Sequence, residues 1–308
     1  MILCVCPNPS VDVFQWLDNL QTGQVNRVRE EEFYPGGKGV HVALAASELG
    51  EDIVLLGFWG GPTGKWIQIQ CKKQGIRCEG PEVEGLTRTC TTFKSTRQSF
   101  DDTELLGAGP ILDEPQISQF YDTFEALIPK ASCITLSGSW PRNSDVHGYA
   151  RLIQRARKHQ KPVYLDCNGE QLENALPKQP TGLHLNISEA RQTYGDHSIE
   201  KIVHLMRHQA DLSALTAGEE GLYLASGKEY IHASYKVEKV HSAVGSGDCL
   251  VAGLAVARIR GYNFGETARL AVACGAANCL RKELGMLHKE DVDRIMPEVS
   301  IQTMQFQT

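Results

Sequence analysis

Short apolar segments alternate with helical patterns along the first half of the chain. Four segments are compact, apolar and bounded by turn residues, as buried parallel strands tend to be: Met1–Cys6, Ile53–Gly57, Ser132–Leu136 and Pro162–Leu165. Between them, apolar residues recur at helical spacing in Lys38–Leu49, Thr63–Lys73, Glu114–Ile128 and Val146–His159. This alternation predicts an α/β fold with a mainly parallel central sheet and helices on both of its faces.

Two stretches break this alternation. Residues 11–34 and 86–106 are strand-like and lack helical periodicity, so we expect them to pair into a small sheet beside the main one. The C-terminal part is rich in helical patterns: Asp248–Ile259, Phe264–Leu284 and Lys289–Ile295. With no internal repeat or linker in the sequence, we expect residues 1–308 to form a single α/β domain with this β extension.

Composition and charge exclude several classes of protein. Of 308 residues, 42% are hydrophobic and 22% charged, as in an ordinary globular protein, and the formal charge of −6 argues against nucleic acid as the main partner. No apolar run is long enough to span a membrane, and Met1–Cys6 lacks the features of a signal peptide. The ten cysteines include no Cys-x-x-Cys pair. Reduced thiols in a cytoplasmic protein are therefore expected.

The segment Val244–Cys249 is the most informative motif in the chain. Gly245, Ser246 and Gly247 are small and precede a helical pattern, so their backbone N–H groups can converge on an anion at the positive end of a helix. Asp248 lies beside that anion site, where it could take a proton from a hydroxyl that attacks phosphorus. The alternative is a glycine-rich turn in which Asp248 only caps the helix.

Glycines precede another helical pattern at Gly36–Gly39. Gly37 would permit close approach of a ligand and Lys38 adds a positive charge, although the spacing is not that of a Walker A loop. Asp12 follows the first predicted strand, where it could bind a sugar diol or cap a turn. Arg88 could bind a phosphate through its guanidinium group, or it could simply be solvated.

Asn186 and Glu189 lie three residues apart at a predicted strand-to-helix junction. That spacing places both side chains on one helical face, where their oxygens could hold Mg²⁺ through water. The same Asn-x-x-Glu pattern is also explained by a capping box.

In their order along the chain, these motifs resemble the ribokinase-like sugar kinases, and among them the phosphofructokinase B branch, which includes 1-phosphofructokinase and tagatose-6-phosphate kinase. The motifs that carry the resemblance are Pro7–Asp12, Gly36–Val40, Gly57–Gly64, Thr87–Arg88, Ser137–Ser139, Asp166, Asn186 with Glu189, and Val244–Asp248. The resemblance implies a Rossmann-like, three-layer α/β domain with a β-sheet lid that often forms a dimer contact. It thus implies a homodimer.

The resemblance also implies roles for individual residues. Asp248 would be the base, with the amides of residues 245–247 around the transferred phosphoryl group. The sugar phosphate would be bound by Asp12, Gly37, Lys38, His41, Arg88 and Ser139. The nucleotide would lie near His184, Asn186, Thr216, Gly218, Gly221 and Asn278. ATP would be the phosphoryl donor, with Mg²⁺ organised by Glu189 and Asn186.

Several positions depart from the family pattern. His41 replaces the usual Asn of the Gly-Gly-Lys-Gly motif, beside the sugar. His184 replaces a lysine expected near the ATP phosphates, and Cys249 replaces the Ser or Thr that usually follows the base. The base, the anion site and the phosphate cations are nevertheless retained, so we expect activity.

The expected reaction is ATP-dependent phosphorylation of a ketohexose phosphate to a bisphosphate. The sequence leaves fructose 1-phosphate, fructose 6-phosphate and tagatose 6-phosphate open, because they differ only in the free hydroxyl and in one stereocentre. Two alternatives also stay open: a kinase of an unphosphorylated sugar or nucleoside, and a catalytically idle sensor of sugar phosphates.

Overall fold

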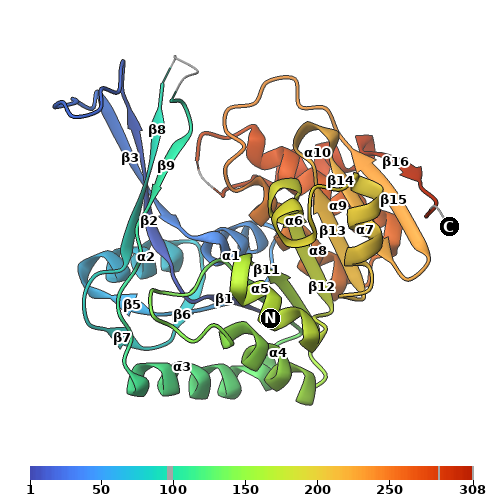
Figure 1. Ribbon diagram of the computed structural model, residues 1–308, viewed down its shortest axis with the longest axis horizontal. Coiled ribbons are helices and arrows are strands. Elements are labelled where there is room, and N and C mark those ends of the chain that lie inside the picture. The colour runs from blue at the N-terminus through green and yellow to red at the C-terminus, as the bar shows by residue number, and fades with distance from the viewer. Residues whose placement is uncertain (96–99, 284, 307–308) are drawn as a thin grey trace.

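A ten-stranded sheet forms the centre of the molecule. The computed structural model describes residues 1–95, 100–283 and 285–306 (Figure 1). Across the sheet the strands run in the order β16 (Ser300–Thr303), β15 (Glu229–Ser234), β14 (Leu222–Ser226), β13 (Leu212–Thr216), β12 (Gly182–Asn186), β11 (Val163–Asp166), β10 (Cys133–Ser137), β1 (Ile2–Cys6), β4 (Ile53–Gly57) and β6 (Arg77–Glu79). From β13 to β6 all neighbours are parallel, whereas β14, β15 and β16 pair antiparallel.

Both faces of the sheet are covered, which explains why the central strands are apolar throughout. In β1, Ile2, Cys4 and Cys6 pack into one hydrophobic core, while Leu3 and Val5 pack into the other. Successive side chains of a strand point to opposite faces, so a strand between two layers must be apolar at every position. The predicted mainly parallel, two-faced sheet is confirmed.

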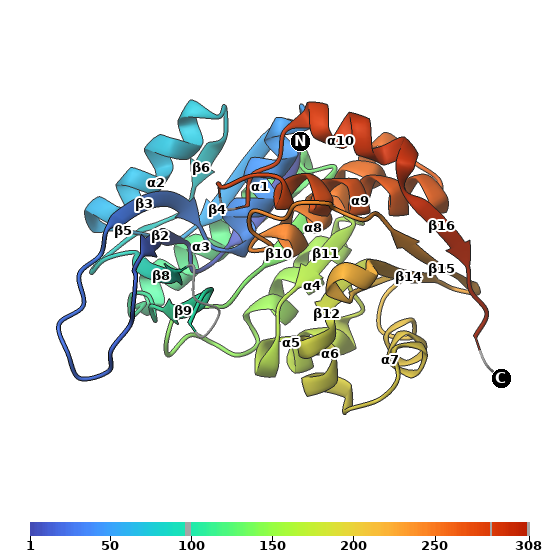
Figure 2. The same ribbon diagram turned by 90° about the horizontal axis from the view of Figure 1, so that it is seen from above.

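Each helical layer belongs to one of these two cores (Figure 2). The first layer is α1 (Lys38–Glu48), α2 (Gly61–Lys73), α8 (Ser246–Arg260), α9 (Phe264–Cys279) and α10 (Lys289–Ile295). The second is α3 (Glu114–Leu127), α4 (Gly148–Lys158), α5 (Gly169–Ala175), α6 (Ile187–Tyr194) and α7 (Ile199–Met206). None of the helices in the described residues has the length and apolar character needed to cross a bilayer.

A second sheet projects from one end of the large one (Figure 1). Its order is β3 (Glu30–Gly36), β2 (Ser10–Trp16), β8 (Arg88–Lys94) and β9 (Thr103–Leu106). Strands from both predicted stretches, 11–34 and 86–106, therefore pair in a small sheet, while residues 17–29 belong to none of its strands and residues 96–99 lie outside the described part of the chain. Nearby, β5 (Trp59–Gly60) and β7 (Glu82–Val83) make a short parallel pair.

Most predicted elements agree with the structure within two residues, and the largest difference is at the end of α9. The apolar pattern predicted a helix to Leu284, but α9 ends at Cys279, and Leu284 itself lies outside the described residues. Residues 280–283 leave the helix, and Gly285, with a φ of +60°, packs back against the start of α8. This return of the chain brings a loop to the edge of the sheet where the predicted motifs meet.

Candidate active site

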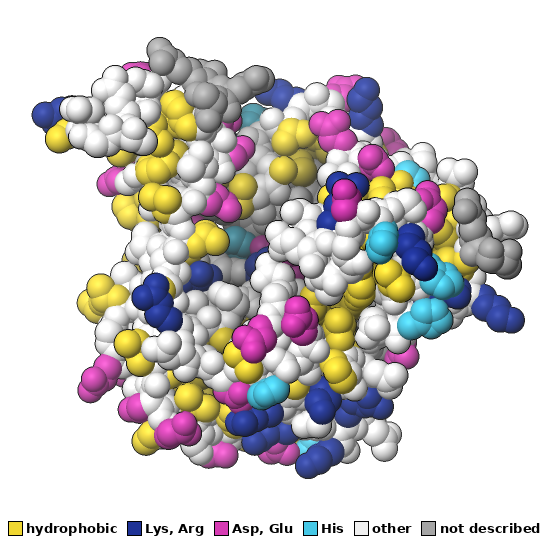
Figure 3. Space-filling view, viewed as in Figure 1, with side chains coloured by type: hydrophobic (Ala, Val, Ile, Leu, Met, Phe, Trp, Pro, Cys, Tyr) yellow, Lys and Arg dark blue, Asp and Glu magenta, His cyan; other side chains and the backbone are white. Residues whose placement is uncertain are grey.

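The carboxyl ends of the parallel strands bring the predicted motifs to one edge of the sheet. Asp166 ends β11, Asn186 ends β12 and Thr216 ends β13, while α1 and α8 begin at the same edge. Ligands of open α/β sheets bind at this edge. Figure 3 shows the surface hollowed between the small sheet and the C-terminal helices, with histidine and basic side chains visible in the hollow.

The start of α8 presents backbone amides to this hollow. Gly245 caps the helix in the left-handed conformation, with φ 82°, and a Cβ there would lie 2.6 Å from Cα of Gly285. The amide of Ser246 donates to the carbonyl of Ala243 at 3.1 Å. In the described chain, the amides of Gly247 and Asp248 have no backbone acceptor, so these two are available to an anion at the helix N-terminus.

Asp248 is buried, 7% exposed, in the first turn of α8. Its Oδ2 lies 2.8 Å from Nδ1 of His41, whereas Oδ1 makes no hydrogen bond within the described residues. Burial raises the pKa of Asp248 above its usual value, although the hydrogen bond and charge of His41 act in the opposite direction. A carboxylate with one committed and one free oxygen is suited to accept a proton from a bound hydroxyl.

Asp12, on β2, lies on the other side of the same histidine. Its Oδ2 is 3.4 Å from Nε2 of His41, and its Oδ1 accepts a 2.6 Å hydrogen bond from the hydroxyl of Ser10. Burial opposes ionisation, but His41, Ser10 and the charge of Arg88 together lower the pKa of Asp12. A Cβ at Gly36 would lie 2.0 Å from Cγ of Asp12, so only glycine fits beside this carboxyl.

Lys38 is held by two buried carboxylates. Its Nζ lies 2.9 Å from Oδ1 of Asp166 and 2.9 Å from Oε1 of Glu189. Asp166 is completely buried, which opposes its ionisation, yet the charges of Lys38 and His184 hold its pKa well below the usual value. Burial disfavours the lysine charge in turn, but Asp166 and Glu189 outweigh that effect and raise the pKa of Lys38.

Arg88 lies at the base of the small sheet. Its Nε donates to the carbonyl of Asn8 at 3.1 Å and its Nη1 donates to the carbonyl of Gly107 at 3.2 Å. Its Nη2 has no protein acceptor in the described chain. Ser139 is exposed, two residues beyond β10, and Gly37 caps α1 with a φ of 95° against Cys6.

Of the residues expected near the nucleotide, His184 and Thr216 contact each other, and Gly218 and Gly221 differ in their surroundings. His184 lies in the middle of β12 and Thr216 ends the adjacent β13, and they interact, with 3.2 Å between Nε2 and Oγ1. Gly218 is exposed, with open space where a Cβ would be, whereas a Cβ at Gly221 would lie 2.4 Å from the carbonyl oxygen of Ala233. Gly218 thus borders open space, and Gly221 is required by the backbone packing.

Asn278 supports the start of α8 from beneath. It is 1% exposed, and its Nδ2 donates to the carbonyl of Val244 at 3.0 Å. The thiol of Cys249 lies 3.6 Å from Oδ1 of Asn278. Cys249 therefore occupies the donor position of the Ser or Thr expected there, and the pair fixes the turn that carries Gly245 and Asp248.

Asn186 and Glu189 form the capping box of α6, and Glu189 also binds Lys38. The Asn186 side chain accepts from the amide of Glu189 at 2.9 Å, and Oε2 of Glu189 accepts from the amide of Asn186 at 3.0 Å. Because Oε1 of Glu189 is bound to Lys38, these oxygens do not form an open ligand set for direct coordination of Mg²⁺. The described residues contain no cluster of three His, Cys, Asp or Glu side chains suited to a metal.

Some residues at the site could not be assigned from the sequence. Asn8, 3% exposed, donates to the carbonyl of Ala108 at 3.2 Å and contacts the Arg88 guanidinium through its own carbonyl. Asp166 was visible as a polar residue ending a strand, which is the signal for a site residue, but its pairing with Lys38 was not. Gly285 gave no local signal, because its only special feature is contact with distant residues.

The comparisons with known proteins agree with this fold. The sequence profile of the pfkB family carbohydrate kinases matches residues 10–289. A Staphylococcus aureus protein provisionally named a phosphofructokinase is 25% identical, with full coverage of both chains and a TM-score of 0.83. Escherichia coli phosphofructokinase-2 in complex with fructose-6-phosphate is 21% identical over 96% of this chain and 98% of that one, with a TM-score of 0.86. A Thermotoga maritima protein provisionally named a 1-phosphofructokinase is 23% identical over 99% of both chains, with a TM-score of 0.89.

The profile covers most of the chain, and the solved structures share its ribokinase-like fold. A family of this kind uses ATP as phosphoryl donor. The chain is therefore a sugar kinase that belongs to the pfkB family of carbohydrate kinases.

Proposed function

We propose that this kinase transfers the γ-phosphoryl group of ATP to a free hydroxyl of a ketohexose phosphate, giving a bisphosphate. The observation that carries the proposal is the placement of Arg88. Its free Nη2 lies at the base of the small sheet, and its charge acts on Asp12, the carboxyl proposed to bind the sugar hydroxyls. A buried phosphate needs paired cations, and a guanidinium group fits it well.

In this proposal each part of the site has one task. Asp12 binds the sugar diol, Asp248 accepts the proton of the attacking hydroxyl, and the amides of Gly247 and Asp248 stabilise the transferred phosphoryl group. His184, Thr216 and Gly218 border the nucleotide. Mg²⁺, when bound, would neutralise phosphate charge and would be held mainly by the phosphates, with Glu189 and Asn186 reaching it through water.

One observation favours an unphosphorylated sugar as the second candidate. Lys38 is already paired with Asp166 and Glu189. Of the two cations of the proposed sugar-phosphate site, only Arg88 is not paired with a carboxylate in the described residues, so less positive charge is available to a phosphate on the sugar. A substrate panel separates the two. ATP consumption should be fastest with fructose 1-phosphate, fructose 6-phosphate or tagatose 6-phosphate. Faster turnover of the corresponding plain sugars would reject the phosphosugar assignment.

Arg88→Ala is the matched variant for that panel. Loss of its charge should weaken binding of the preferred sugar phosphate by about tenfold to a hundredfold, because a charge-assisted hydrogen bond to phosphate is lost. Binding of the plain sugar should change little. Titration calorimetry measures the binding of both sugars. An equal loss for both sugars would mean that Arg88 acts only by holding Asn8 and Gly107. Arg77→Ala, which removes an exposed arginine on β6, serves as the control.

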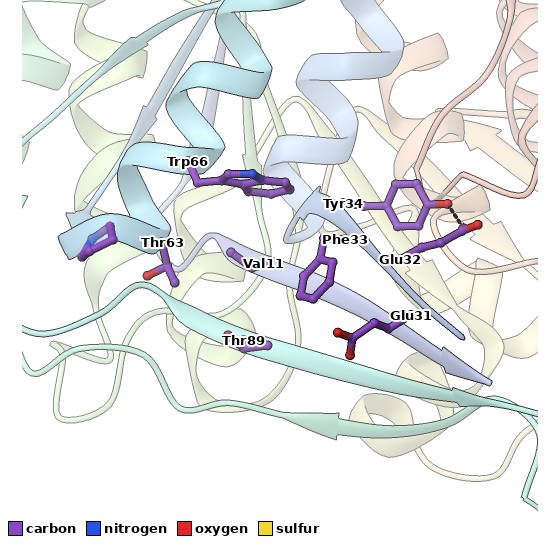
Figure 4. A pocket seen from close by; sticks show the side chains of 9 residues that line it. Val11, Glu31, Glu32, Phe33, Tyr34, Thr63, Trp66 and Thr89 are labelled. Atoms are coloured by element: carbon purple, nitrogen blue, oxygen red, sulfur yellow. Dashed lines mark hydrogen bonds between the residues drawn. The ribbon is translucent and has the colours of Figure 1, made fainter. Parts of the chain in front are cut away.

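We also propose that a second copy of this chain covers the outer face of the small sheet. Phe33 and Leu105 lie on one face of the small sheet, because Phe33 pairs with Val13 and Leu105 pairs with Thr91, and Val13 and Thr91 pair with each other. Their exposed fractions are 50% and 58%. A groove of about 690 Å³ runs between this face and α2, where Phe33, Trp66 and Val11 line it (Figure 4). The inhibited form of phosphofructokinase-2 from Escherichia coli is described as tetrameric.

Light scattering after gel filtration should give a dimer mass of twice 34.0 kDa. Phe33→Glu should give the monomer mass, because a charge would be buried in the contact. Val240→Glu, at an exposed apolar position in the segment between β15 and α8, is the control. A monomeric wild type, or a dimer unaffected by Phe33→Glu, would contradict the proposed contact.

A further inference from the structure

His41 joins the two carboxyl groups that the proposed reaction depends on. It projects from α1, is 4% exposed, and lies between Asp248 of α8 and Asp12 of β2. Its Nδ1 lies 2.8 Å from Asp248 and its Nε2 lies 3.4 Å from Asp12. The contact with Asp248 is a hydrogen bond, whereas the contact with Asp12 is close enough for an ion pair but is not a hydrogen bond. Both ring nitrogens therefore face a carboxylate.

Tight packing fixes the position of this ring. A Cβ at Gly285 would lie 2.1 Å from Cγ of His41, so the loop after α9 lies directly on the imidazole. On the far side, Asp12 is held by Ser10 and by the closeness of Gly36. The ring cannot move away from Asp248 without displacing this loop or the carboxyl of Asp12.

The surroundings favour the doubly protonated ring. Burial disfavours the charge of His41, but the hydrogen bonds and charges of Asp12 and Asp248 outweigh burial and raise the pKa of His41 to about 10. The other titratable or charged groups that act on this trio come from the neighbouring strands and helices: Glu104 on β9, Arg88 and Cys90 on β8, Cys6 on β1, Asp166 on β11 and Lys38 on α1. Without the His41 charge, the site would hold five carboxylates against the two cations Lys38 and Arg88: Asp12, Glu104, Asp166, Glu189 and Asp248.

An asparagine in place of His41 could donate a hydrogen bond but could not carry a charge. On the basis of the proposed kinase reaction, we infer that His41 is a positioning residue: as a cation it orients Asp248, keeps its Oδ1 free for the acceptor hydroxyl, and offsets the carboxylate charge so that two anionic substrates can share the site. The hydroxyl proton passes to Oδ1 of Asp248. The hydroxyl oxygen bonds to the γ-phosphorus, and the bond from phosphorus to the ADP oxygen breaks, its electron pair leaving with ADP. His41 keeps both of its protons.

The kinetic test is the pH dependence of kcat/KM in His41→Asn. The variant keeps an N–H donor but loses the positive charge. Burial raises the pKa of Asp248, and without the charge of His41 less opposes that rise. The acidic limb of the profile should move upward by about one pH unit, the size expected for a lost charge-assisted hydrogen bond. Activity below that limb should fall about tenfold through kcat, with a smaller change in KM. His159→Asn, on the exposed end of α4, should leave the profile unchanged. An unshifted limb in His41→Asn would overturn the inference.

A second test needs neither substrate nor activity. In NMR spectra of the wild-type protein with ¹⁵N-labelled histidine, one buried imidazole should keep both ring protons at pH 8, and its signals should be absent from His41→Asn. In Asp12→Asn the same ring should lose its proton at lower pH, because one carboxylate is gone. A His41 ring that titrates near the ordinary value of about 6.5 would reject the cationic bridge, whatever sugar the enzyme uses. Failure to phosphorylate any sugar, with the bridge intact, would instead reject the proposed function.

Discussion

Asp248→Asn should lower kcat for phosphoryl transfer by about a thousandfold, within the range for loss of a general base. An amide of the same shape can still accept a hydrogen bond from His41, but it cannot take up a proton. Affinity for the sugar phosphate should change by less than about threefold, because Asp12 and Arg88 are untouched. The comparison of kcat from a coupled assay with binding from calorimetry separates the two effects.

The matched control is Glu266→Gln. Glu266 occupies the third position of the neighbouring helix α9, as Asp248 does in α8, but it only completes a capping box with Asn263 at the surface. A glutamine can make the same bonds, so turnover should stay near the wild-type value. If Asp248→Asn retained more than a tenth of the wild-type kcat, Asp248 would not be the base.

The acidity of Asp248 also sets a direction for the wild-type pH profile. The base must be ionised to act, and burial raises its pKa above that of an ordinary aspartate. Activity should therefore be lost as the pH falls, beginning at a higher pH than for an exposed carboxylate. The same loss should be absent from the binding of the sugar phosphate if only the base is responsible.

Lys38→Met should lower the free energy of unfolding by about 3 kcal/mol, at the low end of the cost of breaking a buried ion pair. The change leaves Asp166, which is completely buried, and Glu189 without their cation. In that variant Nδ1 of His184, 3.5 Å from Oδ1 of Asp166, is still a polar neighbour of this carboxylate. Urea unfolding monitored by circular dichroism measures this loss.

Lys65→Met is the control for the size of this effect. Lys65 also lies near the start of a helix, α2, but it is exposed and has no ion pair in the described part of the chain. Its replacement should change the unfolding free energy by less than about 0.5 kcal/mol. Adding Asp166→Asn to Lys38→Met should restore part of the stability, because the unpaired charge is removed. Equal effects of the two lysine variants would show that the Lys38 pairs contribute no net stability.

The sequence alone predicted most of the architecture, because that information is local. A strand covered on both faces must be apolar at each position, and a surface helix must repeat its apolar residues every three to four positions. Those rules placed β1, β4, α1 and α10 nearly to the residue. They did not place the end of α9, since Leu284 continues the apolar pattern while the loop beyond Cys279 is set by its packing on α8 and His41.

The motifs were likewise local, and they identified a sugar kinase from glycines before helices, an aspartate beside an anion site, and their order along the chain. Only the tertiary structure showed which charges meet. His41 and Asp248 are 207 residues apart, and Lys38 is separated from Glu189 by 151 residues. Such pairs depend on which strands and helices meet at one edge of the sheet, and the local pattern of apolar and polar residues does not predict this. The sequence therefore determined which chemical groups are present, and the fold decided that a histidine cation binds the proposed base while Lys38 binds two buried carboxylates.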